Sequence, residues 1–168
     1  MRNIYLIGFM GVGKTAVSKA LSTLIKNETL DTDEMIFHRE KRTIPEIFEK
    51  EGEAYFRRVE TEVFQDISTR KDLIVSCGGG AATLPENVEL MKASGTVVLL
   101  RATPQTVLKR VEHDENRPLL KDKKNIKDIE ALMEKRRAAY ESAADLIVET
   151  DDKTPNAIAS EIMASVDF

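Results

Sequence analysis

The sequence predicts an α/β fold in which helices cover both faces of a parallel sheet. Four short runs rich in Ile, Val and Leu lack the alternation of a half-exposed strand, as expected for strands buried on both faces. They are Asn3–Ile7, Leu73–Cys77, Thr96–Leu100 and Leu146–Val148, and Thr29–Asp31 is a shorter fifth candidate. Segments with helical periodicity alternate with these runs, which favours parallel strands joined by right-handed crossovers.

Helical periodicity is clearest directly after Lys14, where apolar residues recur three and four positions apart up to Ile25. Thr103 and Thr154 each precede a proline, a pattern typical of an N-cap followed by proline in the first helical position. Besides the helix after Lys14, we expect helices over Ala54–Ile67, Pro104–Val111, Ile126–Tyr140 and Pro155–Val166.

The composition is that of one ordinary globular domain, which we take to span residues 1–168. Its net charge of −4 offers no basic surface for a general nucleic-acid binder. No apolar run approaches the roughly 18 residues that cross a bilayer, and the first residues do not resemble a signal peptide. The single cysteine, Cys77, excludes an internal disulfide and suits a reducing compartment. We therefore expect a cytoplasmic protein, with His38 and His113 as surface residues rather than zinc ligands.

The segment Gly8–Thr15 fits the phosphate-loop pattern G-x-x-x-x-G-K-[ST]. Its glycines let backbone N–H groups close around phosphates, and the helix that begins here points its positive end at the same anions. Lys14 is expected to reach the β- and γ-phosphates, and Thr15 to ligate magnesium. The predicted strand before the loop and the amphipathic helix after it argue against a chance glycine-rich turn. The sequence lacks the N-K-x-D pattern by which many GTPases read guanine.

Two carboxylates, Asp31 and Asp33, follow the short strand that should lie next to the first one. If this segment is extended, both side chains point the same way. Asp31 could then hold magnesium through water, and Asp33 could accept the proton of an attacking hydroxyl. A solvated acidic turn is the alternative, because Asp is common in loops.

Two arginines are candidates for binding an anion. Arg57 borders the apolar stripe of its helix, where an arginine can also simply extend its charged end to solvent. Arg136 lies within the stripe formed by Ile129, Met133 and Tyr140, so a buried guanidinium there needs a partner. An internal carboxylate and a substrate carboxylate held at two points are both possible partners.

Gly78-Gly79-Gly80 follows a predicted central strand, at the edge of the sheet where ligands bind in open parallel folds. These glycines allow a ligand to approach the backbone, although a flexible loop is the alternative reading. Cys77 is expected to be packed rather than reactive. The polar segment around Arg117 has the composition of a kinase lid, which excludes water and brings positive charge to the transferring phosphoryl group. A plain surface loop fits that segment equally well.

Taken together, these elements resemble the shikimate kinase family of nucleoside-monophosphate-kinase-like P-loop proteins. The phosphate loop is shared by many families, whereas the joint occurrence of the other elements is specific. The resemblance covers nearly the whole chain and rests on Gly8–Thr15, Asp31-Thr32-Asp33, Phe56-Arg57 with Glu60, Gly78-Gly79-Gly80, Arg117-Pro118-Leu119-Leu120, and Arg136 four residues before Tyr140.

The resemblance implies the reaction ATP + shikimate → ADP + shikimate 3-phosphate, with Mg²⁺ as cofactor, in a monomer. It also implies a three-layer P-loop kinase fold: a five-stranded parallel sheet in the order 2-3-1-4-5 between helices, with a mobile lid. The acceptor-binding region would lie within residues 32–60 and the lid within residues 112–124.

The resemblance further assigns roles to residues. Asp33 would bind the acceptor hydroxyls and serve as base, Arg57 and Arg136 would hold the shikimate carboxylate, and Arg117 would lie near the γ-phosphate. The remaining implied residues are Gly11, Val12, Gly13, Lys14, Thr15, Ala16, Arg110 and Pro155 for ATP, Gly78, Gly79 and Gly80 for shikimate, Thr15 and Asp31 for magnesium, and Phe48 and Phe56 as walls of the ring pocket.

Two other functions stay open. A gluconate kinase of the same fold would also phosphorylate a hydroxylated carboxylate, although the triple glycine and the Phe56-Arg57…Glu60 element argue against it. A non-catalytic nucleotide-binding regulator is the second, and Asp33 argues against it because a mere binder needs no acceptor-side carboxylate.

Overall fold

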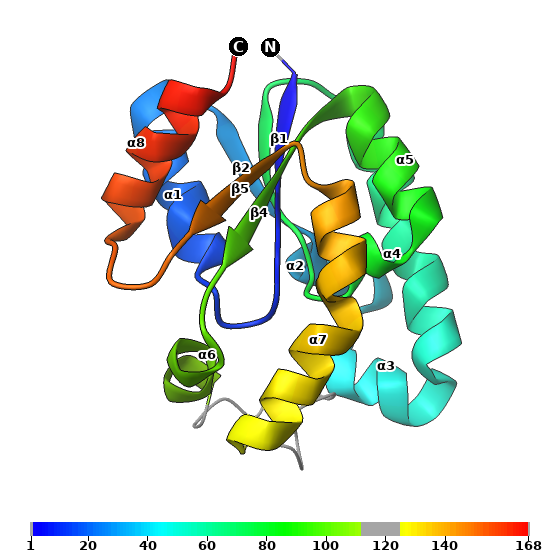
Figure 1. The fold of residues 1–168 in the computed structure, drawn as a ribbon. Helices are drawn as coiled ribbons and strands as arrows, with labels where there is room; N and C mark the ends of the chain where they lie inside the picture. Colours follow the sequence, from blue (N-terminus) through cyan, green and yellow to red (C-terminus); the bar gives the residue numbers. More distant parts are fainter. Residues whose placement is uncertain (1, 112–124, 168) are drawn as a thin grey trace.

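The centre of the molecule is a five-stranded, fully parallel sheet in the order β2-β3-β1-β4-β5 (Figure 1). The computed structural model describes residues 2–111 and 125–167. All five predicted strands are present, and the strand order that the family resemblance implied is confirmed. The strands are β1 (Asn3–Ile7), β2 (Glu28–Asp31), β3 (Leu73–Ser76), β4 (Gly95–Arg101) and β5 (Leu146–Glu149).

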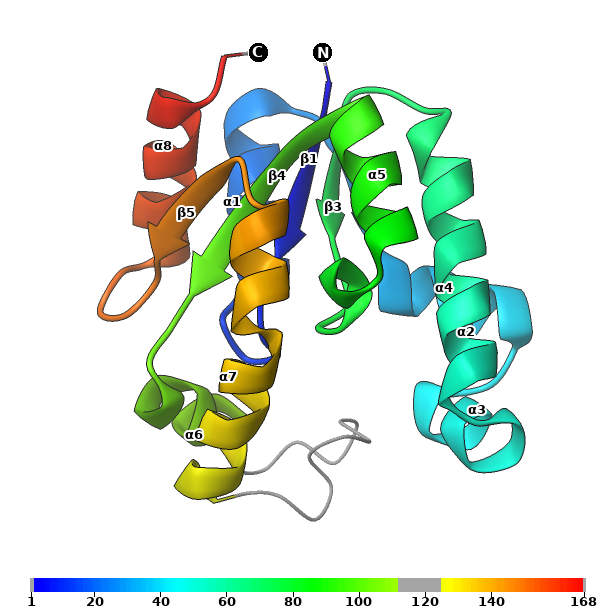
Figure 2. The same ribbon diagram turned by 45° about the vertical axis from the view of Figure 1, so that its right-hand side comes forward.

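Helices cover both faces of this sheet, which explains why its central strands are apolar without alternation. Every residue of β1 and β3 is buried. Figures 1 and 2 show α1 (Lys14–Ile25) and α8 (Pro155–Ser165) on one face, with α4 (Glu53–Ser68), α5 (Pro85–Ser94) and α7 (Ile126–Ala143) on the other. Four shorter helices lie towards the carboxyl ends of the strands: α2 (Thr32–Glu40), α3 (Ile44–Glu51), η1 (Ala81–Thr83) and α6 (Pro104–Val111).

The register of the sheet determines which loops meet. Ile7, at the end of β1, pairs with Leu99, and Ser76 lies opposite both Leu6 and Asp31. The phosphate loop after β1, the glycines after β3 and the start of α2 after β2 therefore lie side by side. This is the edge at which parallel α/β folds bind ligands.

The sequence did not predict α2, α3 or α5. The first two have only nine and eight residues, and α5 buries only Asn87 and Met91, so none of them presents a long apolar stripe. Both expected N-caps are confirmed, because the Thr103 and Thr154 hydroxyls accept hydrogen bonds from the N–H groups of Thr106 and Ala157. Among the described residues, no helix has both the length and the apolar character to cross a membrane. His38 is exposed, as expected, and His113 lies outside the described residues.

Candidate active site

The phosphate loop closes around a cavity of about 300 Å³. Gly11 has φ of 82°, in the left-handed region, and a Cβ there would lie 2.7 Å from Val111 Cγ1, so only glycine fits. The Lys14 ammonium donates to the carbonyls of Gly8 (2.8 Å) and Phe9 (3.1 Å). Because α1 begins at Lys14, the N–H groups of its first turn and its positive dipole end lie at this cavity, as an anion site requires.

Most of the predicted site residues meet at this cavity. A larger cavity of about 490 Å³ lies between α7 and the ends of β4 and β5, but among the described residues Val12 is the only predicted site residue on its wall. Val12 is itself buried in the core, so its side chain is a packing residue. The smaller cavity is lined by Gly11, Gly13, Lys14, Thr15, Ala16, Asp31, Asp33, Ser76, Cys77, Gly78, Gly79 and Arg110.

The condition under which Asp31 and Asp33 would point the same way, one extended segment, is not met. Helix α2 begins at Thr32, and Asp31 is its N-cap: Asp31 Oδ1 accepts hydrogen bonds from the N–H groups of Asp33 (2.9 Å) and Glu34 (3.2 Å). A short polar side chain that follows a strand satisfies the free N–H groups of the next helix in this way. Both carboxylates still line the cavity, because the helix turns Asp33 towards the glycines after β3.

The residues beside the phosphate loop suit a magnesium ion. Thr15 Oγ1 lies 3.4 Å from Asp31 Oδ2, so the predicted hydroxyl and carboxylate are neighbours. Oxygen donors of this kind are the ligands that Mg²⁺ prefers. The described residues contain no group of three His, Cys, Asp or Glu side chains that could hold a metal alone. An ion here would complete its shell with phosphate oxygens and water.

Arg57 lies at the wall of the site, against the third glycine. Its guanidinium pairs with Glu60 (3.0 Å) and Glu53 (3.4 Å), and a Cβ on Gly80 would lie 2.3 Å from Nη2. Its side chain is 13% exposed, so it is not a surface arginine that reaches into solvent. Arg58, by contrast, stacks over Tyr55.

Glu60 is fully buried, and Glu60 and Asp33 converge on Gly78. A Cβ there would lie 2.8 Å from Asp33 Oδ1 and 3.0 Å from Glu60 Oε2. Burial raises the pKa of Glu60 to about 7, Arg57 acts in the opposite direction, and the negative charge of Asp33 raises it further. The carboxyl of Glu60 therefore holds its proton to a higher pH than an exposed glutamate does.

Arg136 is buried, with 7% of its surface exposed, as its place in the apolar stripe predicted. No carboxylate among the described residues pairs with it, and its Nη1 atom has no hydrogen-bond partner there. The guanidinium lies over the ring of Phe9, 5.9 Å from the centroid, and Nη1 faces Gly79. Of the two possible partners for Arg136, an internal carboxylate is thus not found among the described residues.

Tyr140 and Thr32 hold the glycine segment in place. The Tyr140 hydroxyl donates to the carbonyl of Gly79, and the Gly78 N–H donates to Thr32 Oγ1 at 2.9 Å. The segment then turns directly into η1. The glycines after β3 are therefore hydrogen-bonded to residues of α2 and α7, and arginines and carboxylates approach them closely.

The other residues singled out from the sequence lie in different parts of the molecule. Arg110 donates from Nη1 to the Gly11 carbonyl at 2.9 Å, whereas Pro155 is the first residue of α8 and does not line the cavity. Cys77 is buried, and burial raises the pKa of its thiol, in keeping with the expected packing role. Phe48 and Phe56 are in contact, with ring centroids 5.0 Å apart. Arg117 and the predicted lid lie outside the described residues.

Reasoning from residues alone did not assign a role to Glu60 or Tyr140. A signal existed for both: Glu60 stands on the apolar stripe of α4, four residues after Phe56 and four before Phe64, and Tyr140 stands one turn after Arg136. A polar group on an otherwise apolar face requires an internal partner.

A phosphate loop at the carboxyl edge of a 2-3-1-4-5 parallel sheet, with carboxylates and arginines facing it, defines a P-loop kinase of small molecules. The shikimate kinase family model matches residues 10–167. The shikimate kinases of Persephonella marina and Enterococcus faecalis are 42% and 39% identical to the chain. These alignments cover 99% of both proteins for the first and 97% of both for the second. The chain belongs to the shikimate kinase family.

Solved structures agree with this assignment. A shikimate kinase from Acinetobacter baumannii in complex with shikimate superimposes with a TM-score of 0.94 at 39% identity. The comparison covers 98% of this chain and 92% of that one. The shikimate kinase from Aquifex aeolicus superimposes with a TM-score of 0.81 at 39% identity. That comparison covers 97% of this chain and 94% of the other. The three-layer kinase fold and an ATP-dependent kinase activity are thus shared with these relatives.

Proposed function

We propose that this protein transfers the γ-phosphate of ATP to the 3-hydroxyl of shikimate, giving shikimate 3-phosphate and ADP. The observation that carries the acceptor assignment is the buried Arg136 guanidinium, whose Nη1 has no partner among the described residues and faces Gly79. Arg57 stands at the neighbouring Gly80. Two guanidiniums beside one glycine segment are suited to grip a carboxylate on a small ring.

In this proposal the chain acts mainly by positioning and charge neutralisation. Backbone N–H groups of the phosphate loop and Lys14 hold the phosphates, and Arg110 lies at the edge of the nucleotide site. Asp33 orients the acceptor hydroxyl and accepts its proton as the oxygen attacks the γ-phosphorus. Thr15 and Asp31 would hold Mg²⁺, which supplies charge neutralisation to the phosphate oxygens.

Further assignments belong to the same proposal. The chain acts as one domain, with residues 32–60 binding the acceptor, residues 112–124 forming a lid and Arg117 approaching the γ-phosphate. Gly11, Gly13, Ala16 and Pro155 would contact ATP. We also propose a cytoplasmic location and a monomeric state.

The first test is ADP release in a coupled assay with ATP and magnesium, comparing shikimate, quinate, gluconate and no acceptor. We expect strong turnover with shikimate alone, and none in a Lys14→Ala variant. Turnover with gluconate instead would keep the phosphate-loop chemistry and discard the acceptor assignment. Binding of ATP without turnover on any acceptor would favour a nucleotide-binding regulator.

A further inference from the structure

We propose that Asp151 is a positioning residue for the nucleotide: its carboxylate fixes helix α6, which bears Arg110, to the loop that leads to Pro155. This inference rests on the proposed function, because it concerns the ATP side of that same site. Asp151 does not line the phosphate-loop cavity. Its carboxylate is instead engaged by Thr103 and Thr106 at the start of α6, so it would act through the elements that it joins.

The first observation is the set of hydrogen bonds between Asp151 and the start of α6. The carboxylate accepts from the Thr103 N–H (3.1 and 3.2 Å), the Thr103 hydroxyl (3.0 Å) and the Thr106 hydroxyl (2.6 Å). The first N–H groups of a helix lack partners within it, so a carboxylate here both caps α6 and favours its dipole. The Thr106 hydrogen bond lowers the pKa of Asp151, which keeps the carboxylate ionised at neutral pH.

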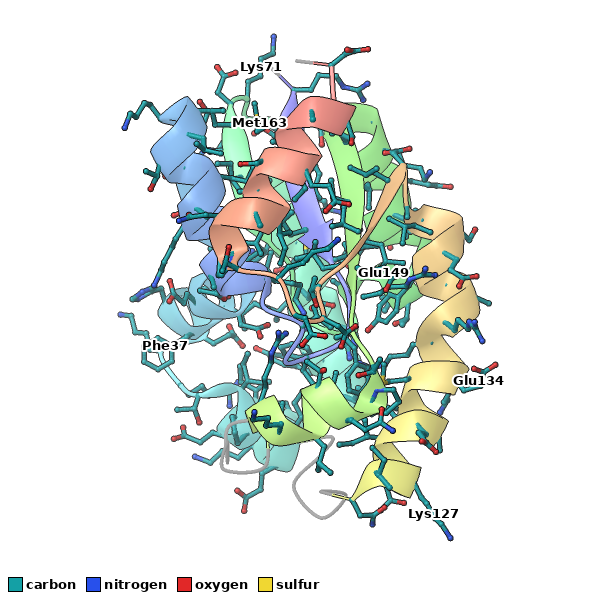
Figure 3. All side chains as sticks on the ribbon, turned by 60° about the vertical axis from the view of Figure 1, so that its left-hand side comes forward. Phe37, Lys71, Lys127, Glu134, Glu149 and Met163 are labelled. Carbon is teal, nitrogen blue, oxygen red and sulfur yellow. The ribbon has the colours of Figure 1, made fainter. Side chains whose placement is uncertain are left out.

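A second set of hydrogen bonds is made by Thr150, one residue earlier in the same loop. Thr150 is fully buried, and its N–H and hydroxyl both donate to the carbonyl of Arg101, at 2.8 and 2.9 Å. The loop after β5 is thus bonded to the end of β4 and to the start of α6 by two consecutive residues. Figure 3 labels Glu149, the last residue of β5, from which this loop departs.

The far end of α6 rests on the phosphate loop. Arg110 Nη1 donates to the Gly11 carbonyl, and the space beside the Gly11 Cα is closed by Val111 Cγ1 and the Val107 carbonyl. A shift of α6 would therefore move Arg110 and change the contacts that Val107 and Val111 make with Gly11. The continuous path from Asp151 through α6 to the phosphate loop is made of direct contacts at each step.

The acceptor residues belong to other elements: Arg57 is on α4, Gly80 follows β3 and Arg136 is on α7. If loss of the Asp151 carboxylate acted only on overall stability, it would weaken the binding of both substrates or of neither. A loss that acts through α6 should weaken nucleotide binding and leave the acceptor site intact. The two readouts therefore separate a positioning role from a structural one.

The sequence offers a matched control at the next position. Asp152 is exposed and has φ of 57°, a conformation that Asn accepts readily. Asp151→Asn and Asp152→Asn remove the same charge from the same loop. Removing a negative charge near a polyanion should by itself strengthen nucleotide binding. If Asp151→Asn weakens nucleotide binding and Asp152→Asn does not, the cause is therefore a change in the geometry of the nucleotide site and not the loss of a charge.

The experiment measures binding of ADP with magnesium by calorimetry, together with KM for ATP, KM for shikimate and the melting temperature. For Asp151→Asn we expect nucleotide affinity to fall about tenfold and KM for ATP to rise similarly, as for lost hydrogen bonds to a charged group. KM for shikimate should stay within about twofold of wild type. Asp152→Asn should bind the nucleotide at least as tightly as wild type and leave KM for shikimate and the melting temperature unchanged.

Thr106→Val provides a second route, because it removes one hydrogen bond to Asp151 and keeps the shape of the side chain. It should give a smaller effect in the same direction, and should add little in the Asp151→Asn background. Unchanged nucleotide affinity in both folded variants, or an equal rise in both KM values, would overturn the proposal. Because the calorimetry needs no acceptor, it decides this point even if shikimate proves to be the wrong acceptor.

Discussion

The guanidinium of Arg57 occupies the space that a side chain on Gly80 would need: a Cβ there would lie 2.3 Å from Nη2 and 2.7 Å from Cζ. The backbone of Gly80 is not the constraint, since its φ of −99° is open to any residue. The glycine is required by an arginine that lies earlier in the chain, on another element. This relationship joins the glycine segment to helix α4 and makes a direct prediction.

We expect Gly80→Ala to displace Arg57 without unfolding the protein, because the clash is with the end of a long side chain. KM for shikimate should rise at least about tenfold, as for a lost charge-assisted contact, while KM for ATP stays unchanged. Steady-state kinetics with each substrate varied in turn measures both. In an Arg57→Ala background the same substitution should add little. Additive effects of the two substitutions would contradict displacement of Arg57 as the cause.

Arg136→Ala should weaken shikimate binding far more than ATP binding. Its guanidinium is buried with Nη1 unsatisfied, so a bound carboxylate would be its natural partner. The neighbour Arg137 is exposed and pairs with Glu134 and Glu141 at the surface, so Arg137→Ala is the matched control and should change neither KM. Loss of ATP affinity alone in the Arg136 variant would place the acceptor pocket elsewhere.

Asp33→Asn should lower turnover by at least about a hundredfold while leaving nucleotide affinity intact, a typical loss for a group that accepts a proton. Single-turnover phosphoryl transfer and ADP calorimetry give the two quantities. Glu34→Gln, one residue along α2 and exposed, should behave like wild type. Near-normal turnover in Asp33→Asn would remove Asp33 as the base.

Glu60 predicts a specific pH dependence of stability. The folded protein holds the Glu60 proton up to about pH 7, whereas the unfolded chain releases it near the usual pKa of 4.5. The contribution of Glu60 to stability is therefore fully present below about pH 4.5 and is lost as pH rises through 7. One pKa unit corresponds to about 1.4 kcal/mol, so the free energy of unfolding falls by roughly 3 kcal/mol as the pH rises through this range.

Denaturant unfolding at pH 5 and pH 8 tests this for wild type and Glu60→Gln, whose amide has no proton to release. Relative to Glu60→Gln, the free energy of unfolding of wild type should fall by roughly 3 kcal/mol between pH 5 and pH 8. Glu62→Gln, at a half-exposed position on the same helix, should show the wild-type pH dependence. Parallel stability curves for wild type and Glu60→Gln would contradict a raised pKa at this carboxyl.

The sequence by itself determined the features that depend on neighbouring residues. The strands, the phosphate loop and the caps at Thr103 and Thr154 follow from local pattern, because period, glycine conformation and capping act over a few positions. The burial of Arg136 also followed, since a helical stripe shows which face is inward. The helix that begins at Thr32 could not be predicted from the sequence, because the same Asp-Thr-Asp fits an extended turn and an N-cap equally well.

Only the tertiary structure decided which distant residues share a site. The packing of helices on the sheet brings Arg57 to Gly80 and leaves Arg136 without a carboxylate partner among the described residues. The pairing of β4 with β5 sets Asp151 against the distant helix that begins at Pro104. Such contacts depend on how strands align across the sheet, and no local pattern encodes that alignment.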